Sequence, residues 1–143
     1  MKLALVHDIS EIRTGDTNYI SRQYTTRNEE KAIMDILEGT TLEHEFLDLW
    51  KEMEAKDTPA SQIVKDADTL DVDLEIVENI YMGKHISQML KAHRIENVQA
   101  KIYTKTAREM QKQIYTSNPH DWHFLSKDNR FNGGDMRLDF EEE

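Results

Sequence analysis

Apolar residues recur along most of this chain at spacings of three and four, which is the repeat of an amphipathic α-helix. The repeat predicts one helix over residues 28–39, capped by Asn28 and ended by Gly39, and another over residues 42–55. The same spacing predicts which side chains face inward on these two helices: Ala32, Ile33, Ile36 and Leu37 on the first, and Phe46, Leu49, Trp50 and Met53 on the second.

A longer helix is predicted to begin at Thr58 and Pro59, because a hydroxyl cap followed by proline suits a first helical turn. Asp68 borders the apolar stripe of this helix. The carboxylates of Asp66, Asp71 and Asp73 are interpreted as its solvated flank, as charged residues on an amphipathic helix usually are. The predicted stripe consists of Ile63, Ala67, Leu70, Leu74 and Val77.

Two further helices are predicted over residues 84–93 and 104–117. The chain has 5 Gly and 2 Pro, and no alternation of apolar and polar residues long enough for a sheet, so the predicted fold class is all-α. Residues 17–27 are predicted to form an extended loop. We expect one domain over residues 1–125, followed by a polar, acidic tail over residues 126–143.

The composition narrows the kind of protein. With 143 residues, 38% hydrophobic and 32% charged, the chain suits a single soluble domain. It contains neither an apolar run long enough to cross a bilayer nor a secretory signal, so no membrane partner and a cytoplasmic location are predicted. The absence of Cys excludes disulfides and thiol nucleophiles, and any bound metal must therefore be held by His and carboxylate groups.

The formal net charge of −10 argues against a nucleic-acid polymer as partner, because such binding depends on neutralising phosphates with Lys and Arg. A small phosphorylated substrate is still compatible with this charge, since a bound divalent ion reverses the local sign that carboxylates create.

One imidazole and three carboxylates lie together between residues 7 and 16, which predicts a metal site. His7 and Asp8 leave a helix about 100° apart, and Glu11 follows at the spacings that stack side chains on one helical face. Gly15 suits a left-handed helix end, which would place Asp16 on the following loop, free to turn back toward the ion. The alternative is a His7 that bonds a backbone carbonyl, with the carboxylates as helix-end charges.

The pattern His-Asp-x-x-Glu-x-x-x-Gly-Asp at residues 7–16 resembles the HD-domain metal-dependent phosphohydrolases, and most closely their 5′-deoxynucleotidase-like branch. Residues 65–68, Lys-Asp-Ala-Asp, are similar to the later Lys-x-x-Asp helix of that family. Residues 94–122 resemble its closing helices, so the similarity covers roughly residues 1–124. The resemblance implies an HD-domain helical bundle.

The resemblance also implies a site and an activity. One divalent ion (Mn, Co, Mg, Fe or Zn) would be held by His7, Asp8 and Asp68. Metal-bound water would then release phosphate from nucleoside 5′-monophosphates, with deoxynucleosides as the expected class. Glu11 would orient or deprotonate that water, and Asp16 would protonate the leaving oxygen or bond the sugar. The loop that follows also makes Asn18 a substrate-binding candidate. Lys65 is either a partner for a phosphate or a carboxylate, or a solvated lysine. A homodimer is expected from the family.

The chain departs from the family in one respect. Family members carry another metal-binding His on an earlier helix, whereas six residues precede His7 here, so we expect a bundle truncated at its N-terminus. Two alternatives remain open: a catalytically inactive HD-type module that binds a nucleotide or a protein, and a helical interaction protein that covers its open core by self-association. The other histidines, none at the family's position, are His44, His85, His93, His120 and His123.

Overall fold

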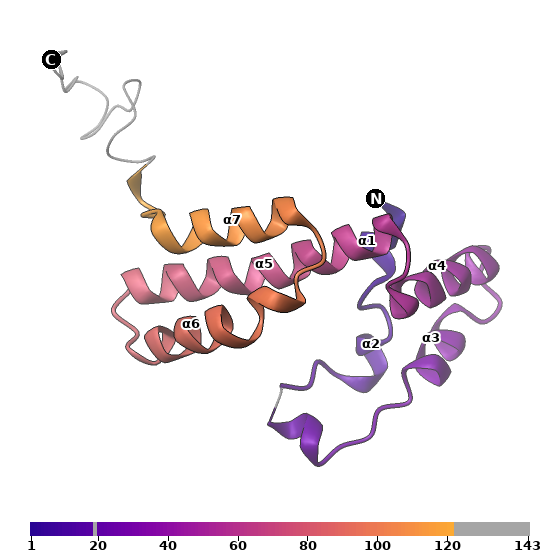
Figure 1. The fold of residues 1–143 in the computed structure, drawn as a ribbon. Coiled ribbons are helices and arrows are strands. Elements are labelled where there is room, and N and C mark those ends of the chain that lie inside the picture. The colour runs from indigo at the N-terminus through magenta and orange to yellow at the C-terminus, as the bar shows by residue number, and fades with distance from the viewer. Residues whose placement is uncertain (19, 122–143) are drawn as a thin grey trace, which may run out of the picture. The chain divides into compact units, whose positions relative to one another are not determined.

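A computed structural model describes residues 1–18 and 20–121. The predicted tail at 126–143 and His123 lie outside the described residues. The described part of the chain is helical and holds no strand, which confirms the predicted all-α class (Figure 1). The helices are α1 (Lys2–Val6), α2 (Glu11–Thr14), α3 (Glu29–Leu37), α4 (Glu43–Ala55), α5 (Pro59–Tyr81), α6 (Ile86–Asn97) and α7 (Lys105–Thr116), with 3₁₀ turns η1 (Ser21–Gln23) and η2 (Gln99–Lys101).

Capping residues mark several of the helix starts. The Asn28 side chain accepts a hydrogen bond from the backbone N–H of Lys31 at 2.9 Å, and α3 begins directly after it. Thr104 caps α7 in the same way, and α5 begins at Pro59 as predicted. No helix among the described residues is both long enough and apolar enough to span a membrane.

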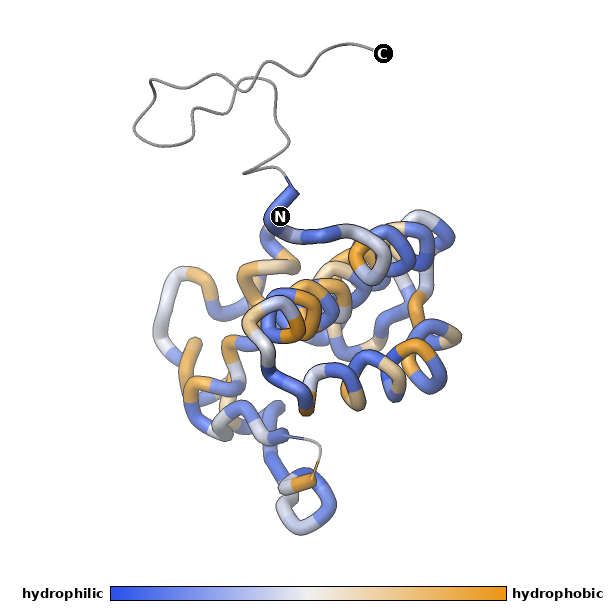
Figure 2. Tube along the Cα trace, turned by 90° about the vertical axis from the view of Figure 1, so that its left-hand side faces the viewer, coloured by the Kyte–Doolittle hydropathy of each residue, from blue (hydrophilic) through white to orange (hydrophobic). Residues whose placement is uncertain are grey.

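The chain divides into two compact units, of which the first is Met1–Asp68. In this unit α4 packs against α1 and α3, and α3 also packs against α2. Hydropathy colouring shows apolar positions recurring between hydrophilic ones along the helices (Figure 2). The buried core of the unit consists of Val6, Ile33, Leu37 and Trp50, with Ile9, Ile36, Phe46, Leu47 and Leu49 packed around it.

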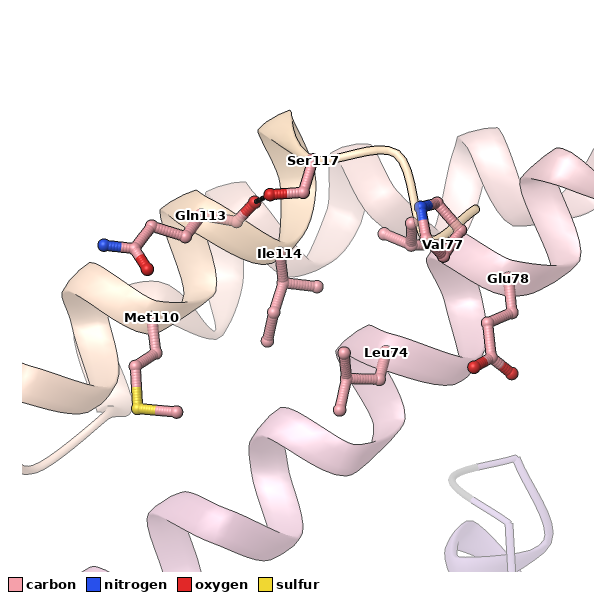
Figure 3. Close-up of a pocket in the computed structure, with 8 residues that line it drawn as sticks. Leu74, Val77, Glu78, Met110, Gln113, Ile114 and Ser117 are labelled. Carbon is pink, nitrogen blue, oxygen red and sulfur yellow. Dashed lines mark hydrogen bonds between the residues drawn. The ribbon is translucent and has the colours of Figure 1, made fainter. Parts of the chain in front are cut away.

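The second unit begins at Thr69. It contains the remainder of α5 and the whole of α6 and α7. Leu70, Ile102 and Ala107 form its buried cluster, and Ile114 packs against them. A hollow of about 250 Å³ lies between α5 and α7 (Figure 3). Its lining is mostly apolar and consists of Leu74, Val77, Glu78, Met110, Gln113, Ile114, Ser117 and Pro119.

The predicted apolar stripe of α5 is largely wrong. Ile63 and Leu74 are 58% and 47% exposed, and Ala67 is exposed as well. Asp66 and Asp73, interpreted as solvated, are instead buried, and Asp73 has no exposed surface. Asp73 can be buried because its carboxylate is paired with polar partners from α6 and α7, as described below.

The helix predicted to run through the first motif is also interrupted. α1 ends at Val6 and α2 begins at Glu11, and residues 7–10 form turns between them. Hydrogen bonds from Ile9 to Val6 and from Glu11 to Asp8 span three residues rather than four. This tighter winding leaves His7 and Asp8 at a junction between two short helices.

Candidate metal centre

His7 presents one ring nitrogen for metal binding, because the other is already used. Its Nδ1 lies 2.8 Å from the backbone oxygen of Ala4. A carbonyl oxygen can only accept, so Nδ1 carries the proton, and the lone pair of the neutral ring is on Nε2. Metal-ligating histidines are usually oriented by this kind of second hydrogen bond. The contact between His7 and a backbone carbonyl is thus compatible with a metal site.

The ligand atoms of His7, Asp8 and Asp68 all lie within 4.8 Å of one another. An ion with ligands at about 2.0–2.4 Å places its donors at most about 4–5 Å apart, so this spacing fits a single divalent ion. One imidazole nitrogen and two carboxylate oxygens form a donor set that such ions accept. The Oδ2 atom of Asp8 also lies 3.0 Å from the Nε2 atom of His7. The geometry therefore supports a metal at this group.

Lys65 lies one helical turn before Asp68 and pairs with it. Its ammonium donates to Asp68 Oδ2 at 2.6 Å. The two side chains are 44% and 35% exposed, so this pair adds little stability by itself. It places a positive charge beside one of the three carboxylate and imidazole donors.

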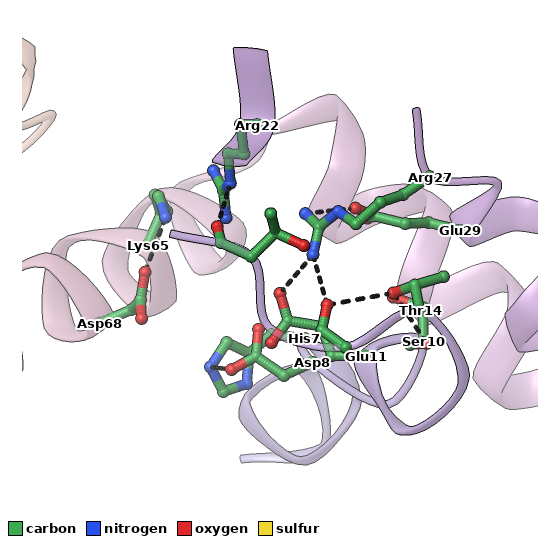
Figure 4. A network of polar contacts seen from close by, with 12 residues as sticks. His7, Asp8, Ser10, Glu11, Thr14, Arg22, Arg27, Glu29, Lys65 and Asp68 are labelled. Carbon is green, nitrogen blue, oxygen red and sulfur yellow. Dashed lines mark hydrogen bonds and ion pairs between the residues drawn. The ribbon is translucent and has the colours of Figure 1, made fainter. Parts of the chain in front are cut away.

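Glu11 lies outside this group of three donors and faces Arg27 (Figure 4). The Arg27 Nη1 donates to Glu11 Oε1 at 3.2 Å and to the carbonyl of Gly15 at 2.9 Å. Nη2 of the same guanidinium lies 2.5 Å from Glu29 Oε1. Arg27 was not singled out in the sequence, because it lies 16 residues from Glu11 without a periodic relation to it.

Asp16 and Asn18 are exposed, and Asp16 is not one of the three close donors. The Asn18 Oδ1 accepts from the backbone N–H groups of Ile20 and Ser21 at 3.1 and 3.0 Å, a local turn. Gly15 has a positive φ of 75°, as expected, but its ψ of 151° is not that of the predicted left-handed helix end. The loop carrying Asp16 thus leaves α2 in an extended direction.

The profile of the HD domain family matches residues 1–117. This chain belongs to the HD-domain family. The resemblance stated from residues 7–16 and 65–68 is therefore confirmed, and so is the expected helical bundle of that family. The limit of the domain at residue 125 stays a prediction.

This HD domain is 35% identical, over 83 residues, to the 5′-deoxynucleotidase HDDC2 of Danio rerio. The alignment covers 54% of this chain and 42% of that relative, so the chain spans less than half of the relative's length. No solved structure matches the chain significantly.

No other histidine of the described HD domain joins such a group. Within residues 1–18 and 20–121, three or more close His or carboxylate donors occur together at His7, Asp8 and Asp68. The Nδ1 of His93 contacts the Asn97 side chain at 3.2 Å, and the ring of His120 packs edge-on against Tyr81. Both rings therefore have contacts of their own away from the three donors.

A second polar cluster lies in the other unit of the HD domain, around the fully buried Asp73. Its carboxylate accepts from Arg94 Nε, from the Tyr115 hydroxyl and, at 2.8 Å, from Gln111 Nε2. Burial alone lowers the pKa of Arg94, but the hydrogen bond and charge of Asp73 outweigh it and raise that pKa. Burial, followed by the hydrogen bond and charge of Asp73, raises the pKa of Tyr115 as well.

The raised pKa of Tyr115 predicts a loss of stability in alkali. Above pH 10.0, its ordinary value, tyrosine in the unfolded chain loses its proton while folded Tyr115 keeps it. The unfolded state then binds fewer protons, so the free energy of unfolding falls as pH rises from about 10. Urea unfolding between pH 9 and 11.5 should show a steeper fall for the parent chain than for Tyr115→Phe. Tyr24→Phe, at a tyrosine that is 83% exposed, should behave like the parent.

Proposed function

We propose that this HD domain is a metal-dependent phosphohydrolase that releases phosphate from nucleoside 5′-monophosphates, with deoxynucleotides the preferred class. The observation that carries the proposal is the convergence of His7, Asp8 and Asp68 within 4.8 Å, with the His7 ring held so that Nε2 is the ligand nitrogen. The similarity to a 5′-deoxynucleotidase supports the substrate class.

His7, Asp8 and Asp68 would hold the ion, and their donor types leave its identity open among Mn, Co, Mg, Fe and Zn. When bound, a divalent ion would lower the pKa of a water molecule and polarise a phosphate oxygen. Lys65, beside Asp68, supplies a cation for a phosphate oxygen once its ion pair opens.

Glu11 is proposed as the group that orients the attacking water and accepts its proton. The water oxygen bonds to phosphorus, and the bond from phosphorus to the 5′ oxygen breaks. Asp16, exposed on the loop after Gly15, is proposed to protonate that leaving oxygen or to bond the sugar, with Asn18 on the same loop near the nucleoside. A homodimer and a cytoplasmic location stay predictions.

The test is phosphate release from a panel of ribonucleoside and deoxynucleoside monophosphates, with Mn²⁺, Co²⁺ or Mg²⁺ added to the metal-stripped chain. We expect metal-dependent turnover, and we expect Glu11→Gln to reduce kcat by about 100-fold or more, as the loss of a general base typically does. Glu30→Gln, an exposed glutamate in the first turn of α3, should leave kcat unchanged.

The absence of turnover with every metal would reject the proposed activity. Nucleotide binding without turnover would then favour the inactive binding module. Turnover that survives Glu11→Gln at the full rate would instead leave the hydrolase in place and remove Glu11 from its mechanism.

A further inference from the structure

Arg27 joins three parts of the first unit through one guanidinium. It contacts the carboxylates of Glu11 on α2 and Glu29 on α3 (Figure 4). It also donates to the carbonyl of Gly15 on the loop that follows α2. The side chains of Arg27, Glu11 and Glu29 are only 16%, 22% and 26% exposed. Water therefore competes less for these contacts than at an open surface.

We propose that Arg27 is a positioning residue of the reaction and acts by holding Glu11 in the arrangement that turnover requires. The inference rests on the proposed hydrolase function. Arg27 is suited to this role because its planar, forked donors fix a carboxylate in direction as well as in distance. A lysine offers a point charge without that fork.

The loop is braced on both sides of Asp16. Arg27 Nη1 donates to the carbonyl of Gly15, and Arg22 Nε donates to the carbonyl of Thr17 at 2.8 Å. The two carbonyls belong to the residues directly before and after Asp16. Of these two arginines, Arg27 also contacts Glu11, so it links the proposed base to the loop that carries the proposed acid.

Glu29 gives the guanidinium a fixed place. Its carboxylate lies on the first turn of α3 and contacts Nη2, while Nη1 is shared between Glu11 and Gly15. Without Glu29, Arg27 would keep its contact with Glu11 but lose its anchor to α3. Glu29→Gln should therefore also reduce kcat, but by a smaller factor than an Arg27 variant does.

The role makes a specific kinetic prediction. The hydrogen bonds and ion pairs of Arg27 within the described residues go to Glu11, Gly15 and Glu29 and not to the metal-binding candidates, so metal affinity should change little when Arg27 is replaced. We expect Arg27→Gln to lower kcat by about 10 to 100-fold, with a smaller change in KM, since a small misplacement of a catalytic group costs about that much. Arg27→Lys should recover part of the loss.

The deciding experiment is a double-mutant cycle on the full chain, with kcat per folded molecule measured for Arg27→Gln, Glu11→Gln and the pair. If Arg27 acts through Glu11, adding Arg27→Gln to Glu11→Gln should lower kcat by less than 3-fold. Arg13→Gln, at an exposed arginine of α2, is the matched control and should leave kcat unchanged. Calorimetric titration with Mn²⁺ follows metal affinity in parallel.

The outcomes separate the two proposals. An active parent chain whose kcat is unaffected by Arg27→Gln, or falls by independent factors in the cycle, rejects the positioning role and leaves the hydrolase standing. A lowered urea midpoint with unchanged kcat per folded molecule also rejects it, because the role is then structural. A parent chain that binds Mn²⁺ but turns over no nucleotide contradicts both proposals.

Discussion

Replacing Asp68 by asparagine is expected to weaken Mn²⁺ binding by about 100-fold or more and to lower metal-dependent turnover at limiting metal. The substitution keeps the size of the side chain but removes one of two carboxylate charges from a group of three donors. Loss of groups that merely orient metal ligands already costs about 10 to 100-fold in metal affinity or activity. The loss of a ligand should therefore lie at or beyond that limit.

Asp71→Asn is the matched control for this substitution. It lies three residues further along α5, is exposed and is not part of the group of three donors. Titration calorimetry of the metal-stripped chains measures the affinities, and turnover at saturating Mn²⁺ separates weak binding from poor chemistry. Equal affinity in the parent and Asp68→Asn would show that the ion, where it binds, does not use this carboxylate.

The second large effect concerns stability, at Asp73. Asp73→Ala is expected to lower the free energy of unfolding by about 3 kcal/mol, because it leaves the charge of Arg94 without its buried partner. The Tyr115 hydroxyl and the Gln111 amide lose an acceptor at the same time. The Arg94 side chain is 16% exposed and can recover some hydration, which keeps the estimate at the low end for a broken buried pair.

Asp73→Asn should cost less than Asp73→Ala. The Gln111 Oε1 is buried and has no hydrogen-bond partner among the described residues, so the amide can rotate and accept from the new Asn side chain. The expected loss is then about 1–2 kcal/mol. Urea unfolding followed by circular dichroism gives both values, with Glu75→Gln, an exposed carboxylate of α5, as the control. Equal losses for Ala and Asn would argue against this rotation.

The features that could be predicted from the sequence are local ones. Asn28, Thr58 with Pro59 and Thr104 each start a helix through contacts made within a few residues, so a short stretch of sequence contains the whole cause. The inner residues of α4, Trp50 and Met53, likewise followed from spacing alone.

Buried polar residues could not be predicted by a rule that assigns carboxylates to the surface. On α5 the row formed by residues 66, 70, 73 and 77 has helical spacing, with Leu70 and Val77 at two of its positions. That row was the available signal for burial of Asp73. Its partners lie 21 to 42 residues away, on helices whose packing the sequence pattern does not give.

The donor types and spacing at residues 7–16 indicated a metal site, but the local backbone structure differs from the helix that the sequence predicted. His7 and Asp8 lie in a tight turn and not on a continuous helix. Arg27 was missed because its contacts depend on how the loop at residues 17–27 returns toward α2, and loops carry no periodic signal. The roles proposed for Asp16, Asn18 and Lys65 stay predictions.

The backbone at Gly15 affects how related sites can be found in other sequences. Its φ of 75° with ψ of 151° is a combination essentially restricted to glycine, and a Cβ there would meet no atom of residues 1–18 or 20–121 within 4 Å. The restriction therefore comes from the torsion angles and not from crowding. When other sequences are compared with this one, matching His and Asp residues indicate the same chemistry, whereas a matching glycine at position 15 indicates the same loop shape. A chain that retains all the donors but has a bulky residue here has had to rebuild the loop, and its substrate should be inferred afresh.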